Sequence, residues 1–334
     1  MLSDKQFIFI IGSSRSGTTW LQIMVGAHPL VCSSVELTVF DSYVAPWVKA
    51  WKKEAAYVRQ WIRGLPFIFS EEEFYGFLRD FVAKVYERVV INNPTATHIV
   101  DKRPAYAGYV QLINRFLPKS RFIHVIRDGR DAAASMLAAR RRVGFGPDNI
   151  RDAAASWKWR VEMARQAEEF GGRYLEVRYE DLLARGPDVL KTVLGFCGLV
   201  LSDENITSIF EAHEFEKMKV GKMTPVKNVK APDGQYWRGK SGNWREELDP
   251  MQRYVFDRIA GDLLQELGYA EKGWWAESPG QRVMLPALAA LSRVRGKIAL
   301  VGKSVFGSTR TRYGRRLRSR MKSSGKGSIG RSAQ

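Results

Sequence analysis

The chain has 334 residues, of which 45% are hydrophobic and 10 are tryptophan, so it can bury the core of at least one large domain. Its formal net charge is +18, a value that by itself suggests a nucleic-acid-binding protein. However, residues 278–334 contain 14 of the 53 Lys and Arg residues and no Asp or Glu, which leaves residues 1–277 near +4. The excess charge therefore belongs to the C-terminal segment, and we expect no nucleic-acid partner.

The first predicted element is a buried strand that runs into a Gly/Ser-rich turn and then a helix, FIFIIGSSRSGTTWL at residues 7–21. Backbone N–H groups converge at such a helix N-terminus and the helix dipole favours negative charge there, so a phosphate ligand is expected. Gly12 and Gly17 have the spacing of the triphosphatase loop G-x-x-x-x-G-K-[ST], but Thr18 stands at the lysine position. Arg15 is the only cation of the loop, which favours a smaller 5′-phosphate group over ATP or GTP. A Gly/Ser turn without a ligand remains the alternative.

Further strands and helices alternate along the chain. Aromatic-rich helices are predicted near 43–62 and 71–91, and short apolar strands near 7–11, 97–100, 122–126 and 174–178. This alternation indicates an α/β fold, a central parallel sheet with helices on both faces. We expect one catalytic domain over residues 1–277 and a basic C-terminal extension over residues 278–334.

A second strand, turn and helix is predicted at residues 121–136, RFIHVIRDGRDAAASM. Arg127 ends the strand and offers a planar bidentate donor for a phosphate, and Ser135 on the helix adds a neutral hydrogen bond. The alternative is that Arg127 forms an ion pair with Asp128 or Asp131.

Residues 14–20, SRSGTTW, resemble the 5′-phosphosulfate loop of the sulfotransferases that use 3′-phosphoadenosine 5′-phosphosulfate (PAPS), and residues 121–136 resemble that family's 3′-phosphate segment. The resemblance covers roughly residues 5–270 and implies a P-loop NTPase-like sulfotransferase fold of the bacterial and Golgi-type branch. It implies PAPS as co-substrate without a metal. It places around the 5′-phosphosulfate Arg15, Ser16, Gly17, Thr18, Thr19 and Trp20, and at the 3′-phosphate Arg127 and Ser135.

Two later segments extend this resemblance. Residues 174–183, YLEVRYEDLL, are similar to a family strand end whose tyrosine lies near the adenine, so Tyr179 is either a base contact or a core tyrosine. Residues 237–245, WRGKSGNWR, are similar to the Gly-x-x-Gly-x-x-Lys element of cytosolic members, although Arg245 stands in place of the lysine. By this resemblance Arg238 and Gly239 would close over the 3′-phosphate.

The resemblance also implies the catalytic groups of an in-line sulfuryl transfer. Glu36 follows the His28-Pro29 turn as in bacterial and Golgi-type members, where a Glu faces the acceptor, so it is the expected general base. Lys102, in VDKRP, matches the family's lysine and could neutralise charge on the sulfuryl group, while Arg15 would stabilise the leaving 5′-phosphate. The alternatives are that Glu36 is an exposed loop carboxylate and that Lys102 is a solvated lysine.

The predicted function is transfer of a sulfuryl group from PAPS to the hydroxyl of a carbohydrate, a glycolipid, or a small alcohol or phenol. A carbohydrate or lipid-linked acceptor is favoured by the Glu-type base and the basic tail. A P-loop small-molecule kinase is the alternative, but Thr18 contradicts its Walker lysine. The two cysteines, Cys32 and Cys197, do not suggest a disulfide framework, and neither Cys nor His spacing offers a metal site.

The C-terminal extension begins with a basic amphipathic helix pattern suited to an anionic membrane surface. Its apolar positions, three and four residues apart, are Leu288, Leu291, Val294, Ile298, Val301 and Val305. Beyond Gly307 the composition is typical of disorder, and packing of the helix on the enzyme is the alternative. Because the first predicted strand begins at Phe7, which leaves no room for a leader or anchor, we expect a cytoplasmic enzyme. The basic helix pattern would make it peripheral to the inner face of the membrane. The sequence leaves the oligomeric state open.

Overall fold

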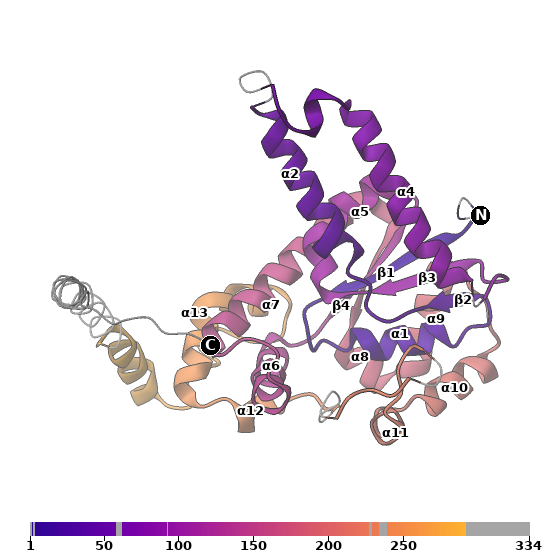
Figure 1. Cartoon of the computed structure of the whole chain (residues 1–334). Helices are drawn as coiled ribbons and strands as arrows, with labels where there is room; N and C mark the ends of the chain where they lie inside the picture. Colours follow the sequence, from indigo (N-terminus) through magenta and orange to yellow (C-terminus); the bar gives the residue numbers. More distant parts are fainter. Residues whose placement is uncertain are drawn as a thin grey trace, which may run out of the picture. The chain divides into compact units, whose positions relative to one another are not determined.

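The computed structural model describes residues 2, 4–57, 62–91, 93–226, 229–233 and 239–291 (Figure 1). The chain divides into two compact units, Met1–Lys272 and Gly273–Gln334. This division concerns packing alone, so the catalytic role of residues 1–277 stays a prediction.

The first unit is an α/β structure with one five-stranded sheet. The strands are β1 (Gln6–Gly12), β2 (Val31–Ser33), β3 (His98–Lys102), β4 (Arg121–Ile126) and β5 (Tyr174–Arg178). The α-helices are α1 (Thr18–Gly26), α2 (Ala45–Ala55), α4 (Glu71–Val90), α5 (Val110–Phe116), α6 (Gly129–Val143), α7 (Ile150–Arg165), α8 (Tyr179–Ala184), α9 (Gly186–Cys197), α10 (Asp203–Ala212), α11 (Phe215–Gly221), α12 (Trp244–Glu247) and α13 (Pro250–Glu266). Shorter turns are the π-helix η1 (Val39–Val44) and the 3-10 helices η2 (Leu65–Phe67), η3 (Pro104–Tyr109) and η4 (Gln166–Arg173).

All strand pairs are parallel, in the order β2-β3-β1-β4-β5. In register, Ile10 of β1 lies opposite Lys102 of β3, and Gly12 lies opposite Val125 of β4. The carboxyl ends of the central strands therefore meet at one edge, where open α/β sheets bind their ligands. The predicted parallel sheet and its helical layers are confirmed.

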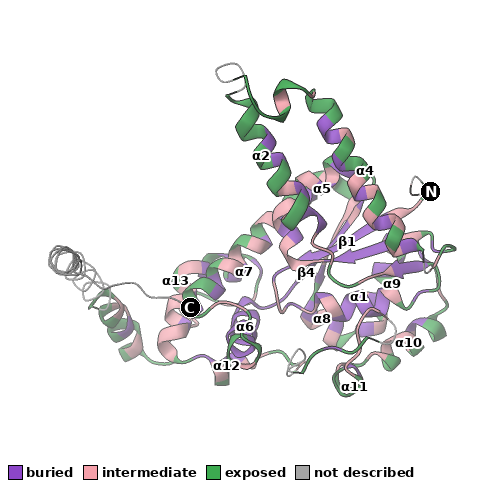
Figure 2. Cartoon of the chain, in the orientation of Figure 1, coloured by how far each residue is buried: buried purple, intermediate pink, exposed green. Residues whose placement is uncertain are grey.

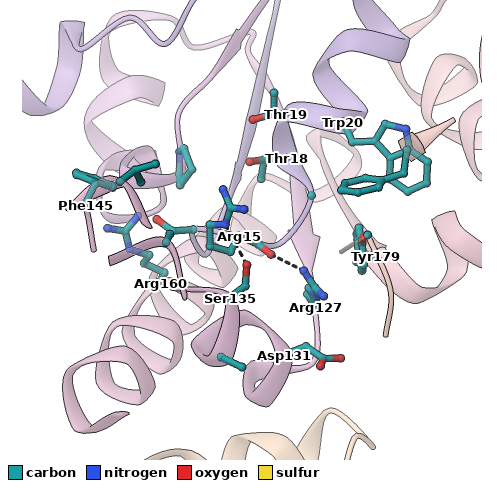
Figure 3. Close-up of a pocket in the computed structure, with 18 of the residues that line it drawn as sticks. Arg15, Thr18, Thr19, Trp20, Arg127, Asp131, Ser135, Phe145, Arg160 and Tyr179 are labelled. Atoms are coloured by element: carbon teal, nitrogen blue, oxygen red, sulfur yellow. Dashed lines mark hydrogen bonds between the residues drawn. The ribbon is translucent and has the colours of Figure 1, made fainter. Parts of the chain in front are cut away.

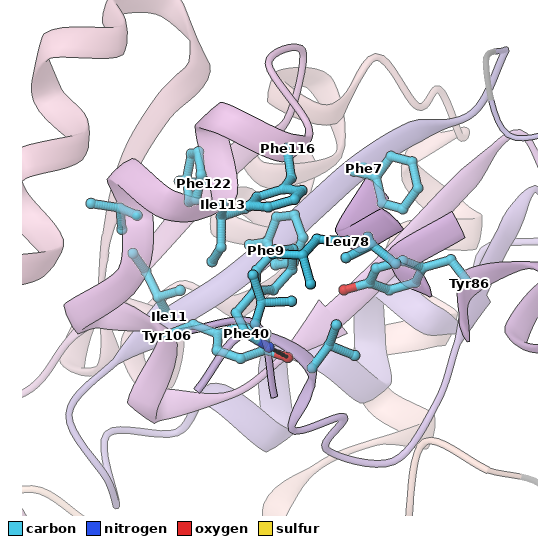
Figure 4. Close-up of a cluster of buried hydrophobic side chains, with 14 of the residues drawn as sticks. Phe7, Phe9, Ile11, Phe40, Leu78, Tyr86, Tyr106, Ile113, Phe116 and Phe122 are labelled. Atoms are coloured by element: carbon cyan, nitrogen blue, oxygen red, sulfur yellow. Dashed lines mark hydrogen bonds between the residues drawn. The ribbon is translucent and has the colours of Figure 1, made fainter. Parts of the chain in front are cut away.

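Side chains of β1 alternate between two cores, because successive residues of a strand point to opposite faces. Phe7, Phe9 and Ile11 pack with α2, α4, η3 and α5, and Phe9 lies at 5.7 Å, centroid to centroid, from Phe122 (Figure 4). Ile8 and Ile10 pack on the other face with α1, α9 and α10. A strand covered on both faces has no polar side, which explains the unbroken apolar run read from the sequence.

Helices α2 and α4 form a hairpin that extends from one face of the sheet, and each carries a buried stripe beside an exposed one (Figures 1 and 2). The predicted helix at 71–91 is confirmed as α4, whose N-terminus has a capping box between Ser70 and Glu73. Of the predicted helix at 43–62, the structure describes α2, which begins at Ala45, with Pro46 in its first turn, after the π-helix η1, and ends at Ala55. Residues 58–61 of this prediction lie outside the described residues.

In the second unit, residues 279–291 are helical, and Val283, Met284, Leu288 and Leu291 are exposed. The remaining predicted amphipathic positions, from Val294 onward, lie outside the described residues. Within the described ranges, no helix has the length and apolar character needed to cross a membrane.

Candidate active site

A cavity of about 550 Å³ opens at the carboxyl edge of the sheet. It is bounded by the loop after β1, by the segments that follow β3 and β4, and by residues of α6, α7 and α12. The residues that line it include Arg15, Gly17, Thr18, Thr19, Trp20, Glu36, Arg103, Arg127, Asp131, Ser135, Val143, Phe145, Arg160, Tyr179, Phe215, Gly239 and Glu247.

The loop between β1 and α1 has the backbone of an anion cradle. Gly12, Arg15 and Gly17 have positive φ values of 144°, 69° and 90°, and α1 begins directly afterwards at Thr18. Among the residues that the structure describes, no side chain caps the N-terminus of α1, and its first turn holds no acidic residue. The Ser16 hydroxyl is buried and has no hydrogen-bond partner in the described part of the chain. A buried hydroxyl and uncapped N–H groups fit a phosphate-bearing ligand.

The two predicted phosphate segments lie together (Figure 3). Arg15 donates from Nε to Oγ of Ser135 at 3.1 Å, and Arg127 donates from one NH2 group to the carbonyl of Arg15 at 2.9 Å. Arg127 also donates to the carbonyl of Lys240 at 2.8 Å, while its buried Nε has no partner among described residues. Both carbonyl bonds fix the guanidinium without neutralising it, so its charge is available to an anion.

The expected alternative, an ion pair of Arg127 with a neighbouring aspartate, is not what these residues form. Asp128 pairs with Arg130 at 2.7 Å and caps α6. Asp131 accepts from the backbone N–H groups of Gly242 at 2.6 Å and Trp244 at 2.9 Å. The Gly239–Trp244 segment is thus held in place from α6, next to Arg127.

Trp20, Tyr179 and Phe215 line the cavity beside Gly17 and Gly239. Tyr179 is 2% exposed and its ring lies under the Arg127 guanidinium, 4.4 Å from the ring centroid. It is therefore at once a core residue and a wall of the cavity. Trp20 donates its indole N–H to the carbonyl of His213 at 2.7 Å. Gly239 has a φ of +60° and lies against the Phe215 ring, whereas Arg238 lies outside the described residues.

Glu36 lines the other end of the cavity and is held by two cations. Lys102 donates a short hydrogen bond to its Oε1, and Arg103 donates to its Oε2 at 3.0 Å. Arg103 also donates to Asp41 at 2.7 Å. The Glu36 side chain is 40% exposed, so it can meet a solvent-borne acceptor.

Lys102 lies behind Glu36 rather than in the cavity wall, with a side chain only 4% exposed. Burial lowers the pKa of its ammonium group, and Glu36 opposes that shift. The adjacent Asp101 is fully buried and accepts from the Tyr86 hydroxyl at 2.7 Å. Burial raises the pKa of Asp101 to about 7.

Several cavity residues were not predicted from the sequence, among them Arg103, Asp131, Phe145 and Arg160. Arg103 is adjacent to a predicted site residue, Lys102, and its position just after β3 could have signalled it. Asp131 was considered only as a partner for Arg127. Phe145 and Arg160 carry no local motif, because they reach the cavity through the packing of α6 and α7. Within the described ranges, no group of three or more His, Cys, Asp or Glu side chains could hold a metal ion.

The sequence model of the Sulfotransferase family matches residues 7–203, which include both phosphate segments and Glu36, Lys102 and Tyr179. The chain belongs to this family. Among curated proteins, protein-tyrosine sulfotransferase 1 of Danio rerio is 27% identical over 273 residues, covering 80% of this chain and 73% of that protein. A putative protein-tyrosine sulfotransferase of Caenorhabditis briggsae is 27% identical over 211 residues, covering 61% of this chain and 70% of that protein.

Two solved structures share the fold at a TM-score of 0.50. One is a mouse sulfotransferase complexed with 3′-phosphoadenosine 5′-phosphate (PAP), 15% identical and covering 79% of this chain and 86% of that chain. The other is the sulfotransferase domain of the Synechococcus PCC 7002 olefin synthase, which is 18% identical and covers 78% of this chain and 96% of that chain. Family membership replaces the kinase alternative.

Proposed function

We propose that this sulfotransferase binds PAPS across the two joined phosphate segments and sulfates an acceptor hydroxyl presented to Glu36. The observation that carries the proposal is the convergence of Arg15, Ser135 and Arg127, with the unpartnered Ser16 hydroxyl and Arg127 Nε beside it. When bound, PAPS supplies the sulfuryl group and leaves as PAP. Residues of the loop after β1 would hold the 5′ end, and Arg127 and Ser135 the 3′-phosphate.

Different residues of the chain have different roles in this reaction. Glu36 accepts the proton of the acceptor hydroxyl, and Lys102 and Arg103 keep its carboxylate directed into the cavity. Arg15 lies at the N-terminus of α1, where a cation and converging N–H groups stabilise charge that develops on a 5′-phosphate. Trp20, Tyr179 and Phe215 offer aromatic faces for the adenine.

The acceptor is proposed as a hydroxyl attached to a ring or other apolar body, since Phe145, Val143 and Pro104 line the same cavity as Glu36. A carbohydrate or lipid-linked hydroxyl was favoured from the sequence. The names of the relatives support a second candidate, the phenol of a tyrosine. A screen of sugars, glycolipids, phenols and tyrosine peptides with radiolabelled PAPS separates these acceptors.

The decisive experiment is calorimetric titration with PAP and with AMP, which differ in the 3′-phosphate. We expect PAP to bind about 100-fold more tightly than AMP. Arg127→Ala should remove most of that difference, because a guanidinium–phosphate contact contributes strongly to binding affinity. Arg151→Ala, an exposed arginine at the start of α7, is the matched control. Absence of PAP binding, or equal loss for both nucleotides in Arg127→Ala, would contradict the proposal.

A further inference from the structure

Arg160 is a cavity arginine that the proposed reaction does not use. It lines the cavity from α7, and no residue in the described ranges forms a hydrogen bond or a salt bridge with it. Its Nε is buried and unpartnered. By contrast, Arg103 is bonded to both Glu36 and Asp41, and Arg127 to two carbonyls. A guanidinium held in a cavity without a partner is suited to a ligand that brings an anion.

The position of Arg160 is fixed by the packing of α7. Trp157, one turn earlier, is fully buried and donates its indole N–H to the carbonyl of Arg127 at 3.1 Å. The neighbouring Trp159 ring lies against Gly108 of η3 so closely that a Cβ at Gly108 would come within 2.4 Å of it. Because both neighbours anchor the helix, Arg160 is presented to the cavity by a rigid element rather than by a loop.

Arg160 lies at the acceptor end of the cavity, the end at which we propose that the acceptor meets Glu36. In Figure 3 it lies beside Phe145, on the side of Arg15 opposite Tyr179 and Trp20. Burial and then the charge of Arg103 lower the pKa of Arg160, and Glu36 and Asp41 act in the opposite direction, so these three groups are near enough to affect its charge. In Figure 3 Arg127, the residue proposed for the 3′-phosphate, also lies on the far side of Arg15 from Arg160, so an anion at Arg160 would belong to the acceptor.

We propose that Arg160 determines acceptor specificity, and that it binds a carboxylate carried by the acceptor while the acceptor's ring or apolar body lies against Phe145. The proposal rests on the proposed function, since it assumes that the acceptor hydroxyl is presented to Glu36. A planar carboxylate matches the two parallel N–H donors of a guanidinium. Phe145 is 77% exposed and Val143 46% exposed, so an acceptor would remove apolar surface from water as it binds.

The test uses two matched pairs of probe acceptors with the full chain and PAPS. One pair is 4-hydroxyphenylacetate and its neutral amide, and the other is methyl glucuronide and its neutral amide, methyl glucuronamide. In each pair the ring is common and the members differ in the charged group. Sulfuryl transfer is measured as kcat/KM, and binding to the PAP-loaded enzyme is measured for every probe, so a probe that is not turned over still gives a result.

For wild-type enzyme we expect the carboxylate member of at least one pair to be favoured about 10- to 100-fold. Arg160→Gln should bring that ratio near one while PAP affinity and thermal stability stay unchanged, and Arg160→Lys should retain part of it. Arg151→Gln, the same change at an exposed position of α7, should leave the ratio intact.

The proposal is overturned if neither carboxylate probe is preferred in transfer or binding, or if Arg160→Gln leaves the preference unchanged. A loss of PAP affinity in Arg160→Gln would assign the residue to the nucleotide instead, and would also overturn it. These outcomes are distinct from failure of the proposed function, in which wild-type enzyme does not bind PAP at all.

Discussion

The ring of Tyr179 occupies the space that a side chain at Gly17 would need. A Cβ built on Gly17 would lie 2.5 Å from Cδ2 of Tyr179, well inside van der Waals contact. Gly17 also has a φ of +90°, in the region that favours glycine. The loop after β1 and the start of α8 therefore pack backbone to ring, and this close approach brings Tyr179 to the cavity.

We expect Gly17→Ala to weaken PAP binding by at least about 10-fold, because the loop must move away from Tyr179 and its N–H groups lose their alignment. The strained φ adds a cost of about 1–2 kcal/mol to folding. Calorimetry and urea unfolding measure the two effects. Gly76→Ala is the control, since Gly76 lies within α4 with nothing within 4 Å of its added Cβ, and it should leave PAP affinity unchanged.

Glu36→Gln should lower kcat by about 10²- to 10⁴-fold, the usual contribution of a general base, while the Kd for PAP stays within about twofold. The amide keeps an oxygen for Lys102 or Arg103 but cannot take the acceptor's proton. Glu247→Gln is the control, because Glu247 also lines the cavity but comes from α12. If Glu36→Gln retained wild-type turnover, the base would have to be another residue.

Local patterns were enough to predict the sheet and the two segments that we propose hold the nucleotide. The apolar run of β1 and the glycines after it are contiguous, and Arg127 lies directly after β4, so each signal is contained within a short window of sequence. Strand β2 was missed because Val31–Ser33 is three residues long and forms no pattern of its own.

The acceptor end was predicted less completely, because it is built by tertiary packing. Arg160 reaches the cavity only because Trp157 is buried against the end of β4, a contact between residues 30 positions apart. Lys102 was predicted to neutralise charge on the sulfuryl group, whereas its hydrogen bond to Glu36 and its burial behind that carboxylate depend on the layers around β3. The contribution of Arg238 stays a prediction.

Asp131→Asn should raise the KM for PAPS about 10-fold with a smaller change in kcat. The carboxylate accepts from two backbone N–H groups of the segment that Arg127 also holds, and an amide can satisfy only one of them. Limited proteolysis near residues 239–244, with and without PAP, reports on that segment directly. Ser241→Ala, which removes only a 3.4 Å contact to Asp131, should behave as wild type. An unchanged KM in Asp131→Asn would show that the segment is held by other contacts.

The buried carboxyl of Asp101 should make stability depend on pH. Burial raises its pKa in the folded state to about 7 from an ordinary value of 3.8. Below pH 4 both states bind the proton. Between pH 4 and 7 the unfolded chain releases it while the folded chain keeps it, so the free energy of unfolding falls as pH rises and then levels off above 7.

Asp101→Asn removes this loss, since the amide carries no titrating proton and its oxygen can still accept from Tyr86. Urea unfolding across pH 4.5–8 should show the variant gaining stability over wild type as pH increases, by an amount on the order of 2–4 kcal/mol. Asp262→Asn, at an exposed carboxylate whose pKa is lowered by Lys158, should show no such gain. A difference between Asp101→Asn and wild type that stays constant over this range would mean that Asp101 is already ionised in the folded protein at pH 4.5, stabilised by Lys102 beside it.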